Sequence, residues 1–374
     1  MRRHHIIAEL QAPDTTFIRQ LLPTSTRCVL RFNAASTANL TIRDTHPAVQ
    51  QLQQDGVRAA VWMVTVDGNN LTTRRLLEGP VGDLSGDGPN GTVTIPVIDD
   101  FVWFSQILGW PNPTAAIATQ TSEVIRHTGP SDVRSLNAIR VQATRLGLPW
   151  NVATGAGVGS SGSTELRMHP VADRILPALT ADRLRLTIER NGPTWDVDVR
   201  EGPEYPRPLT AQSGVLAAWQ WKRQRPQLTR VVVGGDGQKN ERRFATVVNS
   251  ALEAQLSRIM EGFDDSRMAD AGASLTPYGL DALAAAAGKS GVTATLRETS
   301  WFRFPDAYDL GTRVTIQAGA FTASDVITEI EITHAANSGF NVTPKVGFTV
   351  TDPQEKLTQF VAALAASVRT FERS

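Results

Sequence analysis

The 374-residue chain has little of several residue types on which common functions depend. It contains a single cysteine, Cys28, which excludes an intrachain disulfide, and its strand-like surroundings predict a small core residue. The 37 basic and 37 acidic residues cancel, so no global basic field indicates a nucleic-acid-binding protein. No apolar run approaches the roughly 20 residues that a membrane span requires.

The first residues also lack the pattern of a secretory signal. The segment MRRHHIIAEL has two arginines but only a very short apolar run. A signal peptide needs roughly 7–15 consecutive apolar residues. We therefore expect a chain that is made and folded in a cytoplasm and stays soluble there, with residues 1–26 as an irregular lead-in or adaptor arm.

Sequence motifs of catalytic or cofactor chemistry are incomplete. Gly288-Lys289-Ser290 matches the end of a phosphate-binding loop, but Leu283 stands where the pattern needs its first glycine. We prefer a helix C-cap here. The run Gly234–Gly237 follows a predicted strand, but the dinucleotide-loop spacing fails at Asn240. This failure favours a bulged turn between antiparallel strands.

Histidines and carboxylates do not form a recognisable site either. His4 and His5 are adjacent, so their side chains diverge, and no third metal ligand lies nearby. Asp99-Asp100 and Asp264-Asp265 are typical of helix caps or solvated positions. A glycosidase-type carboxylate pair forms in space rather than in sequence, so a cell-wall hydrolase stays a second hypothesis. The sequence predicts no catalytic residue, no cofactor and no metal, and we expect a protein that is not an enzyme.

Trp219 and Trp221 lie on one face of a predicted strand. Core packing is the preferred interpretation of this pair. A platform for a sugar ring is the alternative, and it supports a third hypothesis, a glycan- or receptor-binding module.

The chain is organised around residues 92–110, a strand followed by a short helical turn. Val93, Ile95 and Val97 alternate with polar residues, and Pro96 favours an edge position because proline cannot donate to a ladder. Four large aromatic side chains follow: Phe101, Trp103, Phe104 and Trp110. Such a cluster buries a large apolar area and needs an enclosing wall. We predict a structural plug that closes one end of a β-barrel.

The rest of the chain predicts short strands interrupted by helical segments. Expected strands are 27–32, 40–42, 57–66, 71–81, 184–188, 194–200, 214–222, 229–233, 291–296, 313–316, 326–333 and 341–350. Expected helices are 121–127, 131–146, 247–260, 277–287 and a final amphipathic helix, 353–374. Residues 154–164, rich in glycine and serine, predict a flexible loop.

Several of these segments together resemble a known family. The matching segments are Leu77–Val81, Val93–Asp100, Phe101–Phe104, Val231–Gly235, Leu310–Ile316 and Val346–Phe348. In them the chain is similar to the tail-hub (minor tail) proteins of siphophages infecting actinobacteria, which are related in plan to baseplate hub proteins. The resemblance implies a mainly β protein with α/β inserts and two tail-tube-like β-barrels, the second split by a helical insert.

The implied domains have these limits: a first barrel with its plug helix at 1–113, an α/β insert at 114–206, a second barrel at 207–245 and 309–352, a helical insert at 246–308, and the amphipathic helix at 353–374. The resemblance implies a homotrimeric ring at the virion tail tip that adapts a sixfold tube to a threefold tip. Its implied partners are a distal tail protein or tube-type hexameric ring, the end of the tape-measure protein and other tail-tip proteins. Genome DNA would pass through the lumen without specific binding.

Residues 326–333 predict a strand with two different faces. Glu329 and Glu331 share one of them, and carboxylates on a strand face favour contact with water. We therefore expect Glu329 and Glu331 to face the lumen, where acidic groups would repel DNA phosphates.

Overall fold

The chain begins with two strands where the sequence predicted an irregular lead-in. A computed structural model of the chain describes residues 2–88, 90–237, 241–266, 272, 274–319, 321–335 and 339–347. In it β1 (Arg3–Gln11) pairs with β2 (Phe17–Leu21) and with β5 (Arg58–Asp67). Ile6, Ala8 and Leu10 alternate into the core, while charged and polar neighbours hide this pattern in the sequence.

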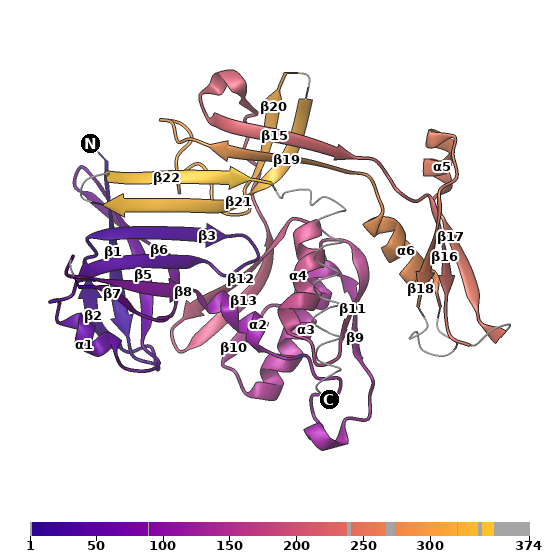
Figure 1. Ribbon diagram of the computed structural model, residues 1–374, viewed down its shortest axis with the longest axis horizontal. Helices are drawn as coiled ribbons and strands as arrows, with labels where there is room; N and C mark the ends of the chain where they lie inside the picture. The colour runs from indigo at the N-terminus through magenta and orange to yellow at the C-terminus, as the bar shows by residue number, and fades with distance from the viewer. Residues whose placement is uncertain are drawn as a thin grey trace. The chain divides into compact units, whose positions relative to one another are not determined.

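The described residues divide into two compact units, and each is considered by itself. The first unit comprises Met1–Ala218 and Ala294–Val346, and the second comprises Trp219–Thr293 and Gly347–Ser374. Strands β15 (Leu216–Gln224) and β19 (Lys289–Leu296) carry the chain out of the first unit and back (Figure 1).

The first unit is built mainly from two sheets. One has the order β2-β1-β5-β6, where β6 (Asn70–Pro80) forms the predicted hairpin with β5. The other contains, in order, β15, β19, β22 (Gly339–Val346), β21 (Phe321–Ala335), β3 (Ser25–Arg31), β4 (Thr37–Arg43), β8 (Thr92–Ile98) and β7 (Ser85–Asp87). At one end β20 (Arg313–Ala318) pairs with both β21 and β14 (Leu209–Thr210).

Strands from the two ends of the chain therefore share one sheet, because β3 pairs with β21 antiparallel. The resemblance implied two separate barrels, at 1–113 and at 207–245 with 309–352. Among the described strands the sheet orders are open paths, with no closed barrel, and the mainly β class is confirmed.

The α/β insert follows the aromatic turn and has its own core. Its elements are η2 (Ile117–Thr119), β9 (Ile125–Pro130), α3 (Ser131–Leu146), β10 (Trp150–Val152), β11 (Ser161–Leu166), α4 (Val171–Ala181), β12 (Leu184–Asn191) and β13 (Thr194–Glu201). The helix at 131–146 and the hairpin of β12 and β13 are confirmed. The helix expected at 121–127 is wrong, because His127 and its neighbours pair with β11 as strand β9.

Two carboxylates anchor the glycine-rich segment 154–164 that the composition predicted to be flexible. Asp132 accepts a hydrogen bond from the backbone N–H of Gly157 at 2.8 Å, and Asp182 accepts one from the backbone N–H of Ser160 at 2.8 Å. These backbone N–H groups bind side chains of the chain itself, as the amides of a packed loop must.

The second unit is a small α/β arrangement rather than a helical insert. Its sheet has the order β17 (Phe244–Val248), β16 (Arg230–Gly234), β18 (Glu261–Asp265). Its helices are α5 (Ser250–Leu256) and α6 (Thr276–Ala285). Of the residues 207–245 predicted for a second barrel, those from β16 onward lie outside the large sheet, because β16 pairs with β17 and β18; β15 does belong to the large sheet.

Four short helices complete the described chain: α1 (Ala48–Leu52), η1 (Asp100–Val102), α2 (Trp103–Gln106) and η3 (Ala211–Ser213). Every helix in the described ranges is too short or too polar to cross a bilayer. The amphipathic helix predicted at 353–374 lies outside the described residues.

Candidate functional site

The aromatic turn after β8 joins the β-sheets of the first unit to the α/β insert. Asp100 and Phe101 begin η1, and Phe104 lies in α2. Phe101 and Phe104 are buried in the same apolar core as α3, α4, β12 and β13. The turn therefore packs against the insert domain, and the plug that we expected to close a barrel is instead a link between two parts of the fold.

A buried ion pair lies at the centre of this link. The Arg58 guanidinium, from β5, donates to both carboxylate oxygens of Asp100 at 2.7 and 2.6 Å. Their side chains are only 7% and 4% exposed. The indole N–H of Trp195, from β13, donates to the same carboxylate at 2.7 Å. Three elements far apart in sequence thus meet on one carboxylate, whose pKa is raised by burial, while Arg58 opposes the shift.

Indole rings surround the ion pair. The ring of Trp103 stacks on Trp150 with centroids 5.7 Å apart and an interplanar angle of 6°, and it lies 5.2 Å from Trp195. The Arg58 guanidinium lies 5.9 Å from the ring centroid of Trp103 and 5.8 Å from that of Trp195. We call Arg58, Asp100, Trp103, Trp150 and Trp195 the junction. Its stacked rings and shared carboxylate favour a fixed orientation of the insert on the sheets.

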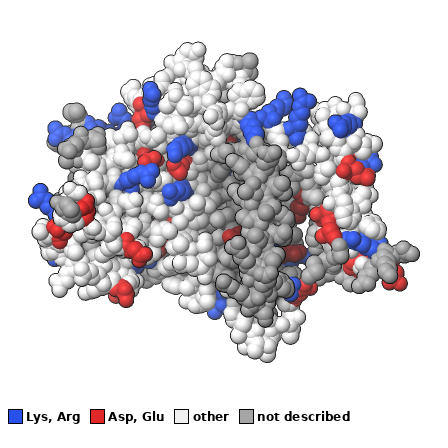
Figure 2. Space-filling model, viewed as in Figure 1, with Lys and Arg blue, Asp and Glu red and all other residues white. Residues whose placement is uncertain are grey.

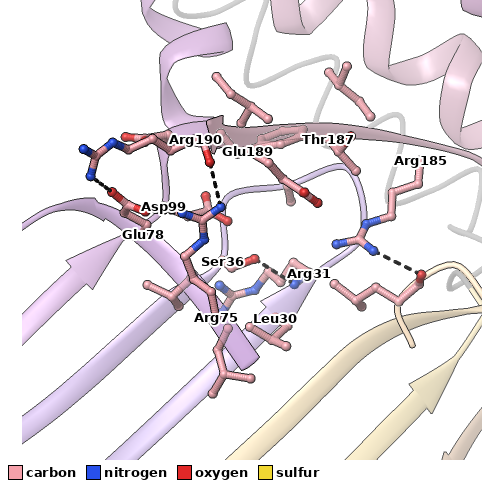
Figure 3. A pocket seen from close by; sticks show the side chains of 18 of the residues that line it. Leu30, Arg31, Ser36, Arg75, Glu78, Asp99, Arg185, Thr187, Glu189 and Arg190 are labelled. Atoms are coloured by element: carbon pink, nitrogen blue, oxygen red, sulfur yellow. Dashed lines mark hydrogen bonds and ion pairs between the residues drawn. The ribbon is translucent and has the colours of Figure 1, made fainter. Parts of the chain in front are cut away.

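A charged cavity of about 270 Å³ opens beside the junction (Figure 3). Glu78 accepts hydrogen bonds from Arg75 at 2.6 Å and from Arg190 at 3.1 Å. On the opposite wall Arg185 donates to the carbonyl oxygen of Leu310 at 3.3 Å. Basic and acidic side chains of the cavity thus largely bind one another, which leaves little unpaired charge for a ligand.

Asp99 is a carboxylate of this cavity with a buried oxygen that is left unbound. Its Oδ1 is buried without a hydrogen-bond partner. Burial raises the pKa of Asp99 to about 6, although hydrogen bonds from Ser36 oppose the rise. Asp99 stands at the N-cap position of η1, as the sequence predicted, but its side chain makes no capping bond.

The other two predicted plug residues are only half-buried. Trp103 contributes to the junction, as described above. Trp110 lies beneath the guanidinium of Arg145, which is 4.4 Å from its ring centroid, and its carbonyl oxygen accepts a hydrogen bond from Gln142 at 3.0 Å. Both contacts come from α3, so Trp110 also joins the turn to the insert.

Glu329 and Glu331 do not form the acidic face that the sequence predicted. Glu331 accepts a hydrogen bond from Arg27 on β3 at 2.6 Å, and Glu329 pairs with Lys345 on β22 at 2.6 Å. A guanidinium from Arg31 lies 3.8 Å from Glu329 as well. Figure 2 shows acidic and basic side chains interspersed over the strands of the first unit. The two carboxylates are therefore neutralised within the subunit, and the premise of a repelling acid surface is wrong; whether this face lines a lumen stays a prediction.

The strand β21 also departs from the expected alternation. Its register with β22 shifts between Ile327 and Glu329, so Thr328 is the extra residue of a β-bulge. Ile327 is fully buried as a result, although simple alternation would place it on the face of the glutamates.

The motifs with alternative chemical interpretations have structural roles. Gly234 ends β16 at a turn between antiparallel strands, as predicted. His4 stacks on Phe340 and binds Thr65 at 2.9 Å, and burial lowers the pKa of His4. Among the described residues no group of three potential ligands could hold a metal ion.

The tryptophans of β15 are exposed, which contradicts the expected core packing. Trp219 is 41% and Trp221 57% exposed.

The residues that sequence analysis missed are Arg58 and Trp195, since neither belongs to a motif. The only signal in the sequence was the strand pattern around each residue. Arg58 is a charge within an apolar strand, and Trp195 lies near the start of a strand in which apolar residues alternate with aspartates.

Comparisons with solved structures place this fold among phage tail proteins. The chain is similar to the prophage tail protein gp18 from Listeria monocytogenes EGD-e, with 10% identity, a TM-score of 0.54, and 96% of this chain and 99% of that chain covered. It is also similar to the 43 kDa tail protein of prophage MuSo2 from Shewanella oneidensis, with 12% identity, a TM-score of 0.52, and coverage of 91% and 97%. A tail protein from Neisseria meningitidis MC58 gives 10% identity, a TM-score of 0.51, and coverage of 92% and 97%.

No curated protein matches the chain in sequence. A family model does match, over residues 23–348, which include the junction and the larger sheet of the first unit but not β1 and β2. By this match the chain belongs to the family of the Siphovirus ReqiPepy6 Gp37-like protein.

Proposed function

We propose that the protein is a structural subunit of a siphophage tail, the hub at the distal end of the tail tube. Three copies form a ring that adapts the sixfold symmetry of the tube to a threefold tip. The partners are a distal tail protein or tube-type hexameric ring, the end of the tape-measure protein and other tail-tip proteins. From the sequence resemblance we expect a phage of actinobacteria.

The observation that carries this proposal is the end-to-end likeness to tail proteins. Each of the three solved structures matches more than nine-tenths of both chains, so the α/β insert and the small unit belong to the shared plan. Fold alone does not define function, but membership in a siphovirus family supports the same conclusion.

The sheet arrangement supports a ring-forming role. Strands β3, β4 and β8 from the N-terminal part lie in one sheet with β21 and β22 from the C-terminal part. Each subunit thus contributes two sets of strands to a common wall. Three copies would supply six such sets, which matches a sixfold tube, and closed cyclic assemblies are the usual outcome for homo-oligomers.

A structural role also agrees with the polar groups of the cavity and the junction. Two carboxylates there, Asp100 and Glu78, bind Arg58 and Arg190 at 2.6 and 3.1 Å. Groups held in this way stabilise a fold and are not free to transfer protons. We therefore propose that the protein is not an enzyme.

The experiment is a phage that lacks this gene. The proposal predicts heads with long-tail assembly arrested at the initiation stage, restored by the gene supplied in trans. Particles with complete tails that fail only at adsorption or cell-wall penetration would contradict a hub and favour a receptor-binding or hydrolytic role.

Exposed tryptophans favour one second candidate, a glycan-binding surface. Trp219 and Trp221 lie on the same strand two residues apart, so their rings project from one face of β15. Binding of host cell-wall glycan that is lost in Trp219→Ser/Trp221→Ser, with assembly unaffected, would support this candidate.

A further inference from the structure

The part of strand β15 that belongs to the second unit is exposed on both of its faces. All residues from Trp219 to Arg223 are exposed, with exposed fractions of 41% for Trp219 and 57% for Trp221. β15 is also the first strand in the order of the large sheet, so no described strand pairs with its outer edge. Side chains two residues apart on a strand project from the same face about 7 Å apart. Trp219, Trp221 and Arg223 therefore form one row, which we call the exposed row.

The exposed row lies in a part of the chain that has no acidic residue. No Asp or Glu occurs from Tyr205 to Gly235 or from Ala282 to Arg297, the segments that contain β15 and β19. Neither Arg223 nor Arg225 forms an ion pair with a residue that the structure describes. Figure 2 shows a group of basic side chains where β15 ends in Figure 1. Because the whole chain has no net charge, this positive region is a local feature.

Protection of a sheet edge explains the basic residues but not the tryptophans. Charged side chains on an edge strand prevent its pairing with another chain. An exposed indole has the opposite effect, because it adds a large apolar surface that favours association. Two exposed indoles in one row with Arg223 therefore indicate a binding surface rather than a protected edge.

We propose that the exposed row binds an acidic glycan, with sugar rings stacked on Trp219 and Trp221 and an acidic group bound by Arg223. This inference rests on the glycan-binding surface described above as the second candidate function, and it specifies the ligand of that surface. An indole offers a large flat apolar face on which a sugar ring can lie. A guanidinium binds an anionic carboxylate or phosphate through two parallel N–H···O hydrogen bonds.

The order of the side chains in the row determines where the acidic group must be. Arg223 lies about 7 Å beyond Trp221 and on the side away from Trp219. The acidic group therefore belongs to a sugar that follows the two stacked rings. A polymer in which every sugar is acidic always offers a charge at this position, whereas a neutral polymer offers none.

Nucleic acid and membrane surfaces fit the exposed row less well. Non-specific binding to nucleic acid depends on neutralising several phosphates at once, and the chain has no net positive charge to assist it. Binding to a lipid surface grows with the apolar area that is inserted. On β15, which is described in full, the two indoles are the only large apolar side chains that are exposed. An acidic glycan uses both features of the row, its flat rings and its cation.

Isothermal titration calorimetry of the full-length protein tests the proposal. The probes are oligomers of galacturonic acid and the methyl esters of the same oligomers, which keep the sugar rings and remove the negative charge. We expect the acid to bind about tenfold more tightly than the ester, because the ester cannot form the hydrogen-bonded ion pair with Arg223. This preference should shrink as the salt concentration is raised, since the row is exposed.

Two variants separate the stacking from the charge. Trp219→Ser/Trp221→Ser should weaken the binding of both acid and ester by about tenfold or more. Arg223→Gln should remove most of the preference for the acid and leave the binding of the ester unchanged. The matched controls are Phe17→Ser, an exposed aromatic side chain on β2, and Arg200→Gln, an exposed arginine on β13. Both controls should bind the two probes as the wild type does.

Equal affinity for acid and ester would overturn the inference and leave a surface for neutral glycans. Tighter binding of oligothymidylate or of phosphatidylglycerol vesicles than of the acidic sugar, lost in the tryptophan variant, would overturn it in favour of nucleic acid or a membrane. No binding of either sugar form would overturn this inference together with the glycan-binding candidate. The hub proposal is tested by the gene deletion, so its failure is distinguishable from each of these results.

Discussion

Replacing Asp100 with asparagine should destabilise the first unit strongly, because it leaves the charge of Arg58 buried and uncompensated. Asparagine keeps the shape of the side chain and an oxygen that can accept the hydrogen bond from Trp195. The change therefore removes the negative charge and replaces one of the two oxygens that accept from Arg58 by an NH2 donor. The paired side chains are 7% and 4% exposed, so water cannot replace the lost partner.

The magnitude follows from the cost of an unpaired buried charge. Breaking a buried ion pair by removing one partner costs about 3–5 kcal/mol of unfolding free energy. Replacing both partners costs less, since no charge is left alone. The double variant Arg58→Met/Asp100→Asn should therefore recover about 2 kcal/mol or more relative to Asp100→Asn.

Urea unfolding followed by tryptophan fluorescence is the assay, because three indole rings lie in the junction. The control is Arg167→Met, which breaks an ion pair with Glu123 whose side chains are about half exposed. That change should cost about 1 kcal/mol or less. If Asp100→Asn costs no more than this control, or if the double variant is less stable than the single one, the reasoning on the junction is refuted.

Three further predictions concern the same unit. Burial raises the pKa of Asp99 from 3.8 to about 6, so the folded protein holds this proton more tightly than the unfolded chain. The free energy of unfolding should therefore fall by about 3 kcal/mol as pH rises from about 4 to about 6. Asp99→Asn should abolish this fall in pH-dependent urea unfolding and raise stability at pH 7. Trp103→Ala should cost about 2–3 kcal/mol in a thermal or urea melt, less than for a fully buried ring, because the indole is half-buried in its stack. In Gly79→Ala the new methyl would lie 2.1 Å from the carbonyl oxygen of Ile98, so β6 or β8 must shift. We expect the free energy of unfolding to fall by about 1–3 kcal/mol, or the protein to be insoluble. The control Gly68→Ala, where the new methyl meets no atom within 4 Å, should stay folded.

Local patterns of sequence predicted the elements that form from local contacts. The helix α3 has polar and apolar residues at helical spacing and ends at Gly147 in the left-handed conformation that glycine favours. The hairpins after Asp67 and Asn191 follow from their turn residues. In these places chain neighbours determine the structure.

Elements that depend on distant partners were missed or misplaced. β1 is stabilised by β5, whose paired residues lie 47 to 63 positions further along the chain, and its own sequence carries too many polar residues for a clear strand pattern. The predicted helix 247–260 is shortened to Ser250–Leu256, and it starts late because Val247 and Val248 pair with β16. Tertiary pairing here overrides a weak helix propensity.

The candidate site was half predictable for the same reason. The aromatic turn was visible because its large side chains are consecutive, and two of them are buried. The partners of this turn could not be predicted, since Arg58 and Trp195 are 42 and 95 residues from Asp100 in the sequence. Likewise, the arginine that binds Glu331 lies 304 residues away on β3, and no sequence pattern links the two.

The measurement that tests the hub proposal most directly is a reconstruction of the intact tail tip without imposed symmetry. The account predicts three copies of this chain around the tube axis, each contributing strands of the large sheet to the wall of one continuous channel. Six copies per tip, or a large sheet lying away from the axis, would contradict it.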